Sequence, residues 1–369
     1  MIDGPPHPAH LEFASRLDAL VPGGLPEEAL PRDEGHVWSP YSAAEALTLV
    51  AAGAGGRTRA ELDEVLGGDR CGHAAALRAA AEGAPGLRAA VSLRIRSGLR
   101  VRPGFAAALA ARPGAAVRTA DFAADPQGVR REVNAEVSAA TGGLLPELLG
   151  PGSVGPGTRA LLLSALLVRL RWKHPFDPAL TAPLPFRAPG GERRVPMMRR
   201  TAEAPYAEAA GWRMVSLAGR GGFFLDVLLP DGPAAPVPAA ADLDALYRAA
   251  GPRLVSVALP RFEASHRTDL AGPLRAAGVR ALFSPAAELS GIAGAPLLVD
   301  SVVHQARLRV DEDGAEGAAA TAVPAAPGGA VRLRPLRFTA DRPFRFVLRR
   351  GPAVLFLGRV ASPADPAAG

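Results

Sequence analysis

Disulfides and cysteine-based metal sites are excluded by the near absence of cysteine. The 369 residues include one cysteine, Cys71, so neither an intramolecular disulfide nor a cysteine zinc site can form. The fold must therefore be held by its hydrophobic core. A composition of 48% hydrophobic and 21% charged residues is typical of a globular protein and not of a disordered chain.

Long hydrophobic runs are also missing. No stretch approaches the roughly 18 apolar residues of a membrane span, and the segment 1–8 lacks the basic flank and apolar core of a signal peptide. We therefore expect a cytoplasmic protein without membrane contact, although export by another route stays open. The net charge of +6 is small and the arginines are interspersed with acidic residues, so no nucleic-acid partner is expected.

Motifs of common enzymes are absent as well. The chain has no Gly-x-Ser-x-Gly turn, no phosphate-binding glycine loop and no dinucleotide fingerprint. Its closely spaced histidines are His7 and His10, which flank Pro8 in a proline-rich segment and are weak candidates for a metal. We expect no metal, no cofactor and no enzymatic activity. A hydrolase whose Ser-His-Asp triad is dispersed along the chain remains the least favoured alternative.

Helical patterns dominate the first part of the sequence. Apolar residues recur at helical spacing from Leu11 to Leu20, which predicts a helix after a loose segment 1–10. Ser39 is expected to cap a buried helix that ends at Gly53. Thr58, in capping-box spacing, is expected to begin the next helix.

Strand patterns dominate the later part. The continuous apolar run Ala160–Val168 predicts a strand buried on both faces. Residues 255–259 and 344–348 alternate apolar with smaller or polar side chains, which predicts half-buried strands. Helices early, strands late and no regular alternation between them predict an α+β fold.

One segment of small residues does not fit a simple linker. Residues 312–330 are rich in Ala and Gly but lie between strand-like stretches of one fold, where long insertions are usually functional. With the two-residue period of a strand, one face carries only small side chains, those of Ala315, Gly317, Ala319 and Thr321. Overpacking a core costs about 1–3 kcal/mol. Such a face therefore suits a strand that must enter a packed sheet.

This segment resembles the reactive-loop hinge of the serpin family, in which Glu-x-Gly-Thr-Glu is followed by small residues ending in Thr. Further blocks resemble the family in the same order, and they lie at residues 38–42, 53–58, 133–134, 141–143, 158–172, 175–177, 195–198, 259–262, 341–344 and 355–360. The resemblance spans nearly the whole chain from about Leu11. The sequence is therefore identified as a member of the serpin family, of the bacterial type.

The resemblance implies one serpin domain over residues 11–369, with three β-sheets, about eight or nine helices and an exposed reactive-centre loop at about 312–337. It implies a monomeric inhibitor that acts as a suicide substrate of a serine-type protease. The protease would cut the loop, the loop would insert into the central sheet, and the protease would be trapped covalently. The hinge residues implied are Glu312, Gly314, Ala315, Gly317, Ala318, Ala319, Ala320 and Thr321.

The resemblance also implies two sites inside the molecule. The shutter beneath the sheet corresponds to Ser39, Ser42, Ser164 and His304. The tryptophan of the breach, where the loop would enter, corresponds to Trp172. Ser164 stands where the family has Asn, a change that leaves a hydrogen bond to water or lowers the barrier to sheet opening.

Two hinge residues depart from the family without arguing against insertion, whereas Pro324 keeps an alternative open. Ala315 and Gly317 stand where the family has Thr and Ala; both are small, and Gly adds flexibility at an entropic cost. Pro324 cannot donate to the ladder of a central strand. A non-inhibitory serpin that serves as a substrate, carrier or chaperone is therefore the main alternative.

Two ways of counting place the scissile bond differently. The family's spacing from Glu312 leads to Gly328 and Gly329, which suit an elastase-like or subtilisin-like protease with a small primary pocket. Counting back from Phe338 leads to Ala330–Arg332, and a cut between Arg332 and Leu333 would suit a trypsin-like pocket. We predict the Gly328–Gly329 bond, because insertion depends on the length of strand between hinge and cut. Mass spectrometry of the released C-terminal fragment should find Gly329 as its first residue; a fragment that begins at Leu333 would indicate a trypsin-like target.

Overall fold

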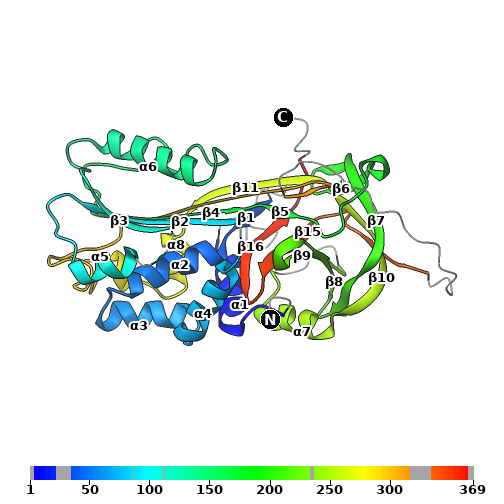
Figure 1. The fold of residues 1–369 in the computed structure, drawn as a ribbon, viewed down its shortest axis with the longest axis horizontal. Coiled ribbons are helices and arrows are strands. Elements are labelled where there is room, and N and C mark those ends of the chain that lie inside the picture. The colour runs from blue at the N-terminus through cyan, green and yellow to red at the C-terminus, as the bar shows by residue number, and fades with distance from the viewer. Residues whose placement is uncertain are drawn as a thin grey trace.

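Figure 1 shows the computed structural model, which describes residues 4–21, 35–84, 86–110, 112, 114–232, 237–315 and 334–364. The helices in these residues are α1 (Pro8–Asp18), α2 (Pro40–Ala51), α3 (Gly56–Val65), α4 (Arg70–Ala81), α5 (Pro103–Ala110), α6 (Pro126–Ala140), α7 (Ala240–Ala249) and α8 (Ala271–Ala276). In this part of the chain no helix has the length and apolar character needed to cross a membrane. The α+β class is confirmed.

The central sheet has five strands in the order β11-β12-β4-β2-β3. They are β2 (Leu87–Arg96), β3 (Ala115–Ala120), β4 (Ala160–Val168), β11 (Phe262–Asp269) and β12 (Ser301–Val310). A separate pair joins β5 (Leu170–Arg171) to β13 (Gly314–Ala315). This pair matters for function, because β13 begins the small-residue segment.

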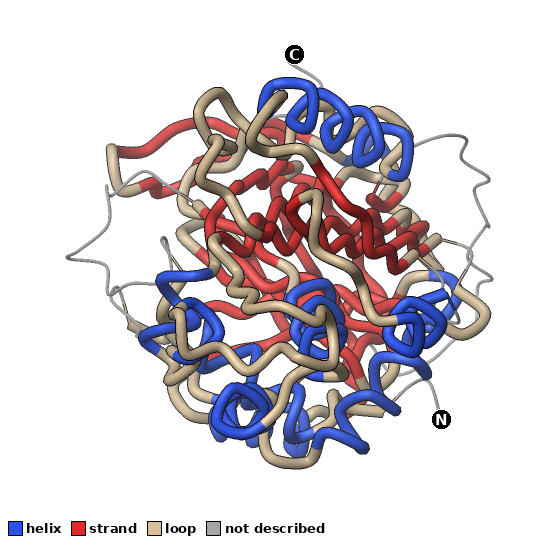
Figure 2. The backbone as a smooth tube through the Cα atoms, turned by 90° about the vertical axis from the view of Figure 1, so that its left-hand side faces the viewer, coloured by secondary structure: helices blue, strands red, loops and turns tan. Residues whose placement is uncertain are grey.

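The second sheet has nine strands in the order β1-β16-β15-β9-β8-β7-β10-β14, with β6 paired to β7. They are β1 (His36–Trp38), β6 (Ala182–Ala188), β7 (Gly191–Ala209), β8 (Trp212–Ala218), β9 (Phe223–Pro230), β10 (Gly251–Pro260), β14 (Leu336–Thr339), β15 (Phe344–Arg350) and β16 (Ala353–Val360). Both views show most helices gathered on one side of the strands and α6 alone on the other (Figures 1 and 2).

Helices on both sides explain why β4 is buried throughout. The valines of α6, Val129, Val133 and Val137, form one apolar cluster with Leu161 and Leu163 of β4. The alternate residues of β4, such as Leu162 and Val168, belong to the main core on the opposite face. The prediction of a strand buried on both faces is confirmed.

Two helix starts differ from the prediction. Helix α1 begins at Pro8, and the His7 amide donates to the Pro352 carbonyl oxygen at 2.7 Å, so the described residues before Leu11 are not loose. Helix α3 begins at Gly56 with Gly55 as its N-cap. Thr58 therefore lies inside the helix, where its hydroxyl accepts from the Glu288 amide at 2.9 Å. The predicted helix start at Thr58 is therefore wrong, because the Thr58 hydroxyl bonds to the distant backbone amide of Glu288 and does not cap the helix.

Strand β15 is fully buried, although alternation predicted a half-buried strand. Arg345 Nη1 lies 2.8 Å from Asp18 Oδ2, and Arg349 Nε lies 2.7 Å from Asp226 Oδ2. Both carboxylates are completely buried. The arginines are buried because each is paired, and neither partner can be recognised from the local pattern.

The helix cap that begins α2 provides a stability test. The Ser39 side chain accepts from the Ser42 amide at 3.0 Å, whereas the buried Ser42 hydroxyl has no partner among the described residues. Ser39→Ala should lower the free energy of unfolding by about 1 kcal/mol. Ser42→Ala, the matched control in the same turn, should change it by about 0.5 kcal/mol or less, because no hydrogen bond is lost. Urea denaturation measures both, and equal losses would contradict the assigned cap.

Candidate functional site

The central sheet is only half closed between its two parallel strands β12 and β4. Residues Ser301–Gln305 of β12 pair with Leu161–Ala165 of β4. The pairing ends there, although β12 continues to Val310 and β4 to Val168. In these two described strands, the carboxyl-terminal halves are therefore not bonded to each other.

The small-residue segment begins at this opening. Gly314 lies opposite Arg171 and Ala315 opposite Leu170, in an antiparallel register. Arg171 and Leu170 directly follow β4, so β13 pairs with the chain that continues β4. The Asp311 amide donates to the Gly314 carbonyl oxygen at 2.8 Å, which turns the chain back after β12. The hinge has thus formed the first two positions of an antiparallel strand at the mouth of the sheet.

Gly314 is required by this geometry. Its φ is +144°, in the region that favours glycine, and an added Cβ would lie 2.0 Å from the Leu170 carbonyl oxygen. No side chain can be accommodated there without moving the backbone of β5.

Glu312 anchors the hinge through a buried carboxylate. The residue is 5% exposed. Arg261 Nε lies 2.8 Å from each carboxylate oxygen, and the Thr181 hydroxyl donates to Oε1 at 2.5 Å. Although burial alone raises the pKa of Glu312, the hydrogen bonds from Arg261 and Thr181 hold it below its usual value. The carboxylate is therefore ionised when the hinge is in place.

Trp172 fixes the backbone beside Glu312. Its ring is completely buried, and its Nε1 donates to the Asp311 carbonyl oxygen at 2.9 Å. Its backbone amide donates to the Asp313 carbonyl oxygen at 3.0 Å. The structure therefore places Trp172 against the backbone on both sides of Glu312.

The four residues assigned to the shutter meet at the closed half of the sheet. Residues Ser164 and His304 lie directly opposite each other in the register. His304 Nε2 accepts from the Ser39 amide at 3.0 Å, so the proton of the neutral ring must be on Nδ1. Nδ1 then donates to the Ser164 hydroxyl at 2.9 Å. The ring stays neutral because burial lowers the pKa of His304 to about 3.

The same proton assignment bears on the hydrolase alternative. Because His304 directs its N–H at Ser164, it presents no lone pair that would take the serine proton. Both side chains are also buried. This Ser-His pair is therefore not a nucleophile with its base.

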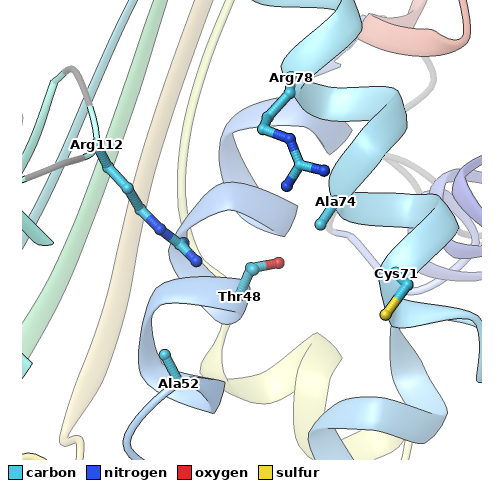
Figure 3. Close-up of a pocket in the computed structure, with 6 residues that line it drawn as sticks. All are labelled: Thr48, Ala52, Cys71, Ala74, Arg78 and Arg112. Atoms are coloured by element: carbon cyan, nitrogen blue, oxygen red, sulfur yellow. The ribbon is translucent and has the colours of Figure 1, made fainter. Parts of the chain in front are cut away.

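A cavity of about 210 Å³ lies between α2 and α4 (Figure 3). It is lined by Thr48, Ala52, Cys71, Ala74, Arg78 and Arg112. In this view Arg112 extends toward Thr48 from the left and Arg78 from above. This lining offers no carboxylate or imidazole for acid–base chemistry, and the described residues contain no cluster of three or more metal-ligating side chains.

Several predicted site residues lie outside the described residues. They are the hinge residues Gly317, Ala318, Ala319, Ala320 and Thr321, the loop residue Pro324, and the scissile-bond candidates Gly328, Gly329, Arg332 and Leu333. Sequence reasoning also missed Thr181 and Arg261 as partners of Glu312. Arg261 lies 51 residues from Glu312, so no local spacing could have paired them.

The central sheet is thus mixed, is paired over only part of β4 and β12, and has β13 paired with β5 beside the unpaired part. The family model described as Serpin (serine protease inhibitor) matches residues 25–363. The chain therefore belongs to the serpin family.

Individual relatives support this assignment. Putative serpin-Z12 of Oryza sativa subsp. japonica is 32% identical over 406 residues, which covers 94% of each chain. The leukocyte elastase inhibitor of Bos taurus is 34% identical over 349 residues, covering 88% of this chain and 92% of that protein. The crystal structure of Serpin48 from the insect Tenebrio molitor has a TM-score of 0.80 at 26% identity, covering 96% of this chain and 98% of that one. These relatives come from a plant and from animals, so the expected bacterial type is not borne out.

The anchor of the hinge can be tested by removing one charge. Glu312→Gln should lower the free energy of unfolding by about 1–3 kcal/mol, because Arg261 loses a charged acceptor. It should also speed hydrogen exchange at the Gly314 amide. Asp313→Asn, which removes a charge from the next residue without breaking the Arg261 contact, is the matched control. Exchange at Gly314 that is equal in the two variants would show that the ion pair does not hold the hinge.

Proposed function

We propose that this protein inhibits a serine-type protease as a suicide substrate. The protease cuts the loop that follows β13, and the freed segment enters the central sheet between β4 and β12. The protease is carried along while its nucleophile is still bound to the loop as an acyl ester. The pairing of β13 with β5 supports this proposal best, because it begins a strand at the place where the sheet is open.

The register of β13 supports a specific position for the inserted strand. Continued from the pairs Gly314–Arg171 and Ala315–Leu170, the antiparallel register brings Thr321 opposite Ser164. Ser164 already lies opposite His304. In the inserted state β4 and β12 would separate. The Thr321 hydroxyl would then lie between the side chains of Ser164 and His304, which are hydrogen-bonded to each other before insertion. His304 would then donate to Thr321 in place of Ser164.

The same register assigns faces to the inserted residues. Thr321 would point to the same side of the sheet as Ser164. On that side Leu162 and Val168 of β4 belong to the main core. The residues at alternate positions before it, Ala315, Gly317 and Ala319, would share this face. The alanines between them would face the side of α6. The small-residue face would therefore meet the main core.

Insertion would release enough free energy to drive the trap. About ten new ladder hydrogen bonds at roughly 1 kcal/mol each give on the order of 10 kcal/mol. This rivals the stability of an ordinary domain, about 5–15 kcal/mol. The form with the loop outside the sheet is then metastable, and cleavage makes the change irreversible. The protein acts once and catalyses nothing itself.

Pro324 favours one alternative, a non-inhibitory serpin. In the continued register Pro324 would lie opposite Leu161, at a position where a central strand needs an N–H. Insertion would then stop beyond Val323, and the loop would be cut without trapping the protease.

A pair of arginine substitutions tests the mechanism. The protein is mixed with elastase-like, subtilisin-like and trypsin-like proteases, and complexes that survive boiling in SDS are counted. Gly317→Arg would put a charged chain against the main core opposite Val168, so the yield of complex should fall at least tenfold while the loop is still cut. Ala318→Arg, directed to the opposite face, is the matched control and should keep most of the complex.

Two results would contradict the proposal. Equal complex formation by Gly317→Arg and the wild type would exclude insertion in this register. Cleavage of the wild-type loop without complex formation by any protease of the panel would favour the non-inhibitory alternative.

A further inference from the structure

Two histidines far from the loop form a buried pair between α1 and α4. His10 is 0% and His73 is 1% exposed. His10 Nδ1 lies 2.7 Å from His73 Nε2. The outer nitrogens face backbone carbonyl oxygens: His10 Nε2 lies 3.1 Å from that of Val354 in β16, and His73 Nδ1 lies 2.8 Å from that of Leu66. All four ring nitrogens are therefore engaged.

These contacts need three protons. A carbonyl oxygen only accepts, so each outer nitrogen must carry a hydrogen, and the central contact needs one more. Two neutral imidazoles carry two protons and satisfy two of the three contacts. One added proton satisfies all three. Two added protons would set N–H against N–H across 2.7 Å, so the docked pair holds at most one.

Burial and the surroundings also disfavour charge on the pair. Burial, followed by the neighbouring His73, lowers the pKa of His10 to about 3. Burial lowers the pKa of His73 as well. Two further titratable groups act on the pair, His7 before α1 and Asp69 at the start of α4. His7 Nε2 lies 3.8 Å from Asp69 Oδ2.

The elements behind the pair add little compensating charge. Strand β16 contributes the backbone oxygen of Val354. Arg350 of β15 contacts α4 at its other end, through the carbonyl oxygens of Ala80 and Glu82. Asp69 is the anion that acts on His73, and it also lies beside His7.

We propose that the His10–His73 pair is a proton-operated latch that docks the first turns of α1 on α4 and β16 and releases them in acid. Once released, both imidazoles regain a pKa of about 6.5. Release below that pH therefore takes up one or two protons more than the docked pair holds. Because the docked pKa values are lowered, docking is stable above about pH 6.5 and weakens as the pH falls. The released population rises about tenfold to a hundredfold per pH unit.

The opposite end of α1 would stay in place. Asp18, its last residue, accepts from His36 Nε2 and from Trp38 Nε1, each at 2.9 Å, and pairs with Arg345. Between the two ends lies Phe13, whose ring centroid is 6.2 Å from that of Trp38. Release from the His10 end would therefore expose Phe13 while Asp18 still holds the helix.

Hydrogen exchange along α1 tests this latch. Opening constants for the amides of Leu11 to Phe13, corrected for intrinsic exchange, should rise at least about eightfold between pH 6 and pH 5. The double variant His10→Gln/His73→Gln should remove this dependence. His174→Gln, which replaces an exposed histidine, should keep it. A local measurement is needed because His304 also takes up a proton when the whole protein unfolds.

Nitrogen-15 NMR of the wild-type histidines gives a second measurement if the double variant does not fold. We expect a coupling across the central N–H···N contact and titration of the pair well below pH 6.5. Opening constants that are equal at pH 6 and pH 5, or two histidines that titrate independently near pH 6.5, would overturn the proposal.

Discussion

The incomplete pairing of two parallel strands is the constraint on which the rest of this structure depends. Strands β12 and β4 bond over residues Ser301–Gln305 and Leu161–Ala165 and then run on without a shared ladder. Parallel pairing is slightly less stable per residue than antiparallel pairing. A strand that entered between them would run antiparallel to both neighbours and gain a ladder on each side. Under the proposed mechanism, such a strand would therefore give a more stable arrangement of the same sheet.

Polar contacts are concentrated at the two ends of this junction. At the open end, Arg261 and Trp172 hold the hinge through Glu312 and the neighbouring backbone. At the closed end, His304 links Ser164 to the start of α2. A buried ion pair contributes little net stability when its desolvation is counted. Its contribution here is positional, because the contact with Arg261 fixes where Glu312 lies.

Local patterns were sufficient for the elements whose burial depends on their own sequence. The apolar run of β4 and the Ser39 cap of α2 were predicted correctly, since the period and the capping side chain lie within the element. Thr58 and the arginines of β15 were misjudged for the opposite reason. Their environment is set by Glu288, Asp18 and Asp226, which lie far away in the sequence.

The sequence by itself determined the family, the α+β class and the face of small residues that a strand entering a sheet requires. Only the tertiary structure shows the pairing of β13 with β5, because those two residue pairs join segments that no local pattern connects. The tertiary structure also decided which buried polar side chains contact each other. Glu312 and Arg261 lie 51 residues apart, and His10 and His73 lie 63 apart. Hydrogen bonds act over a few ångströms in space. The order of residues in the sequence does not say which distant residues come that close, so these pairs could not be predicted from it.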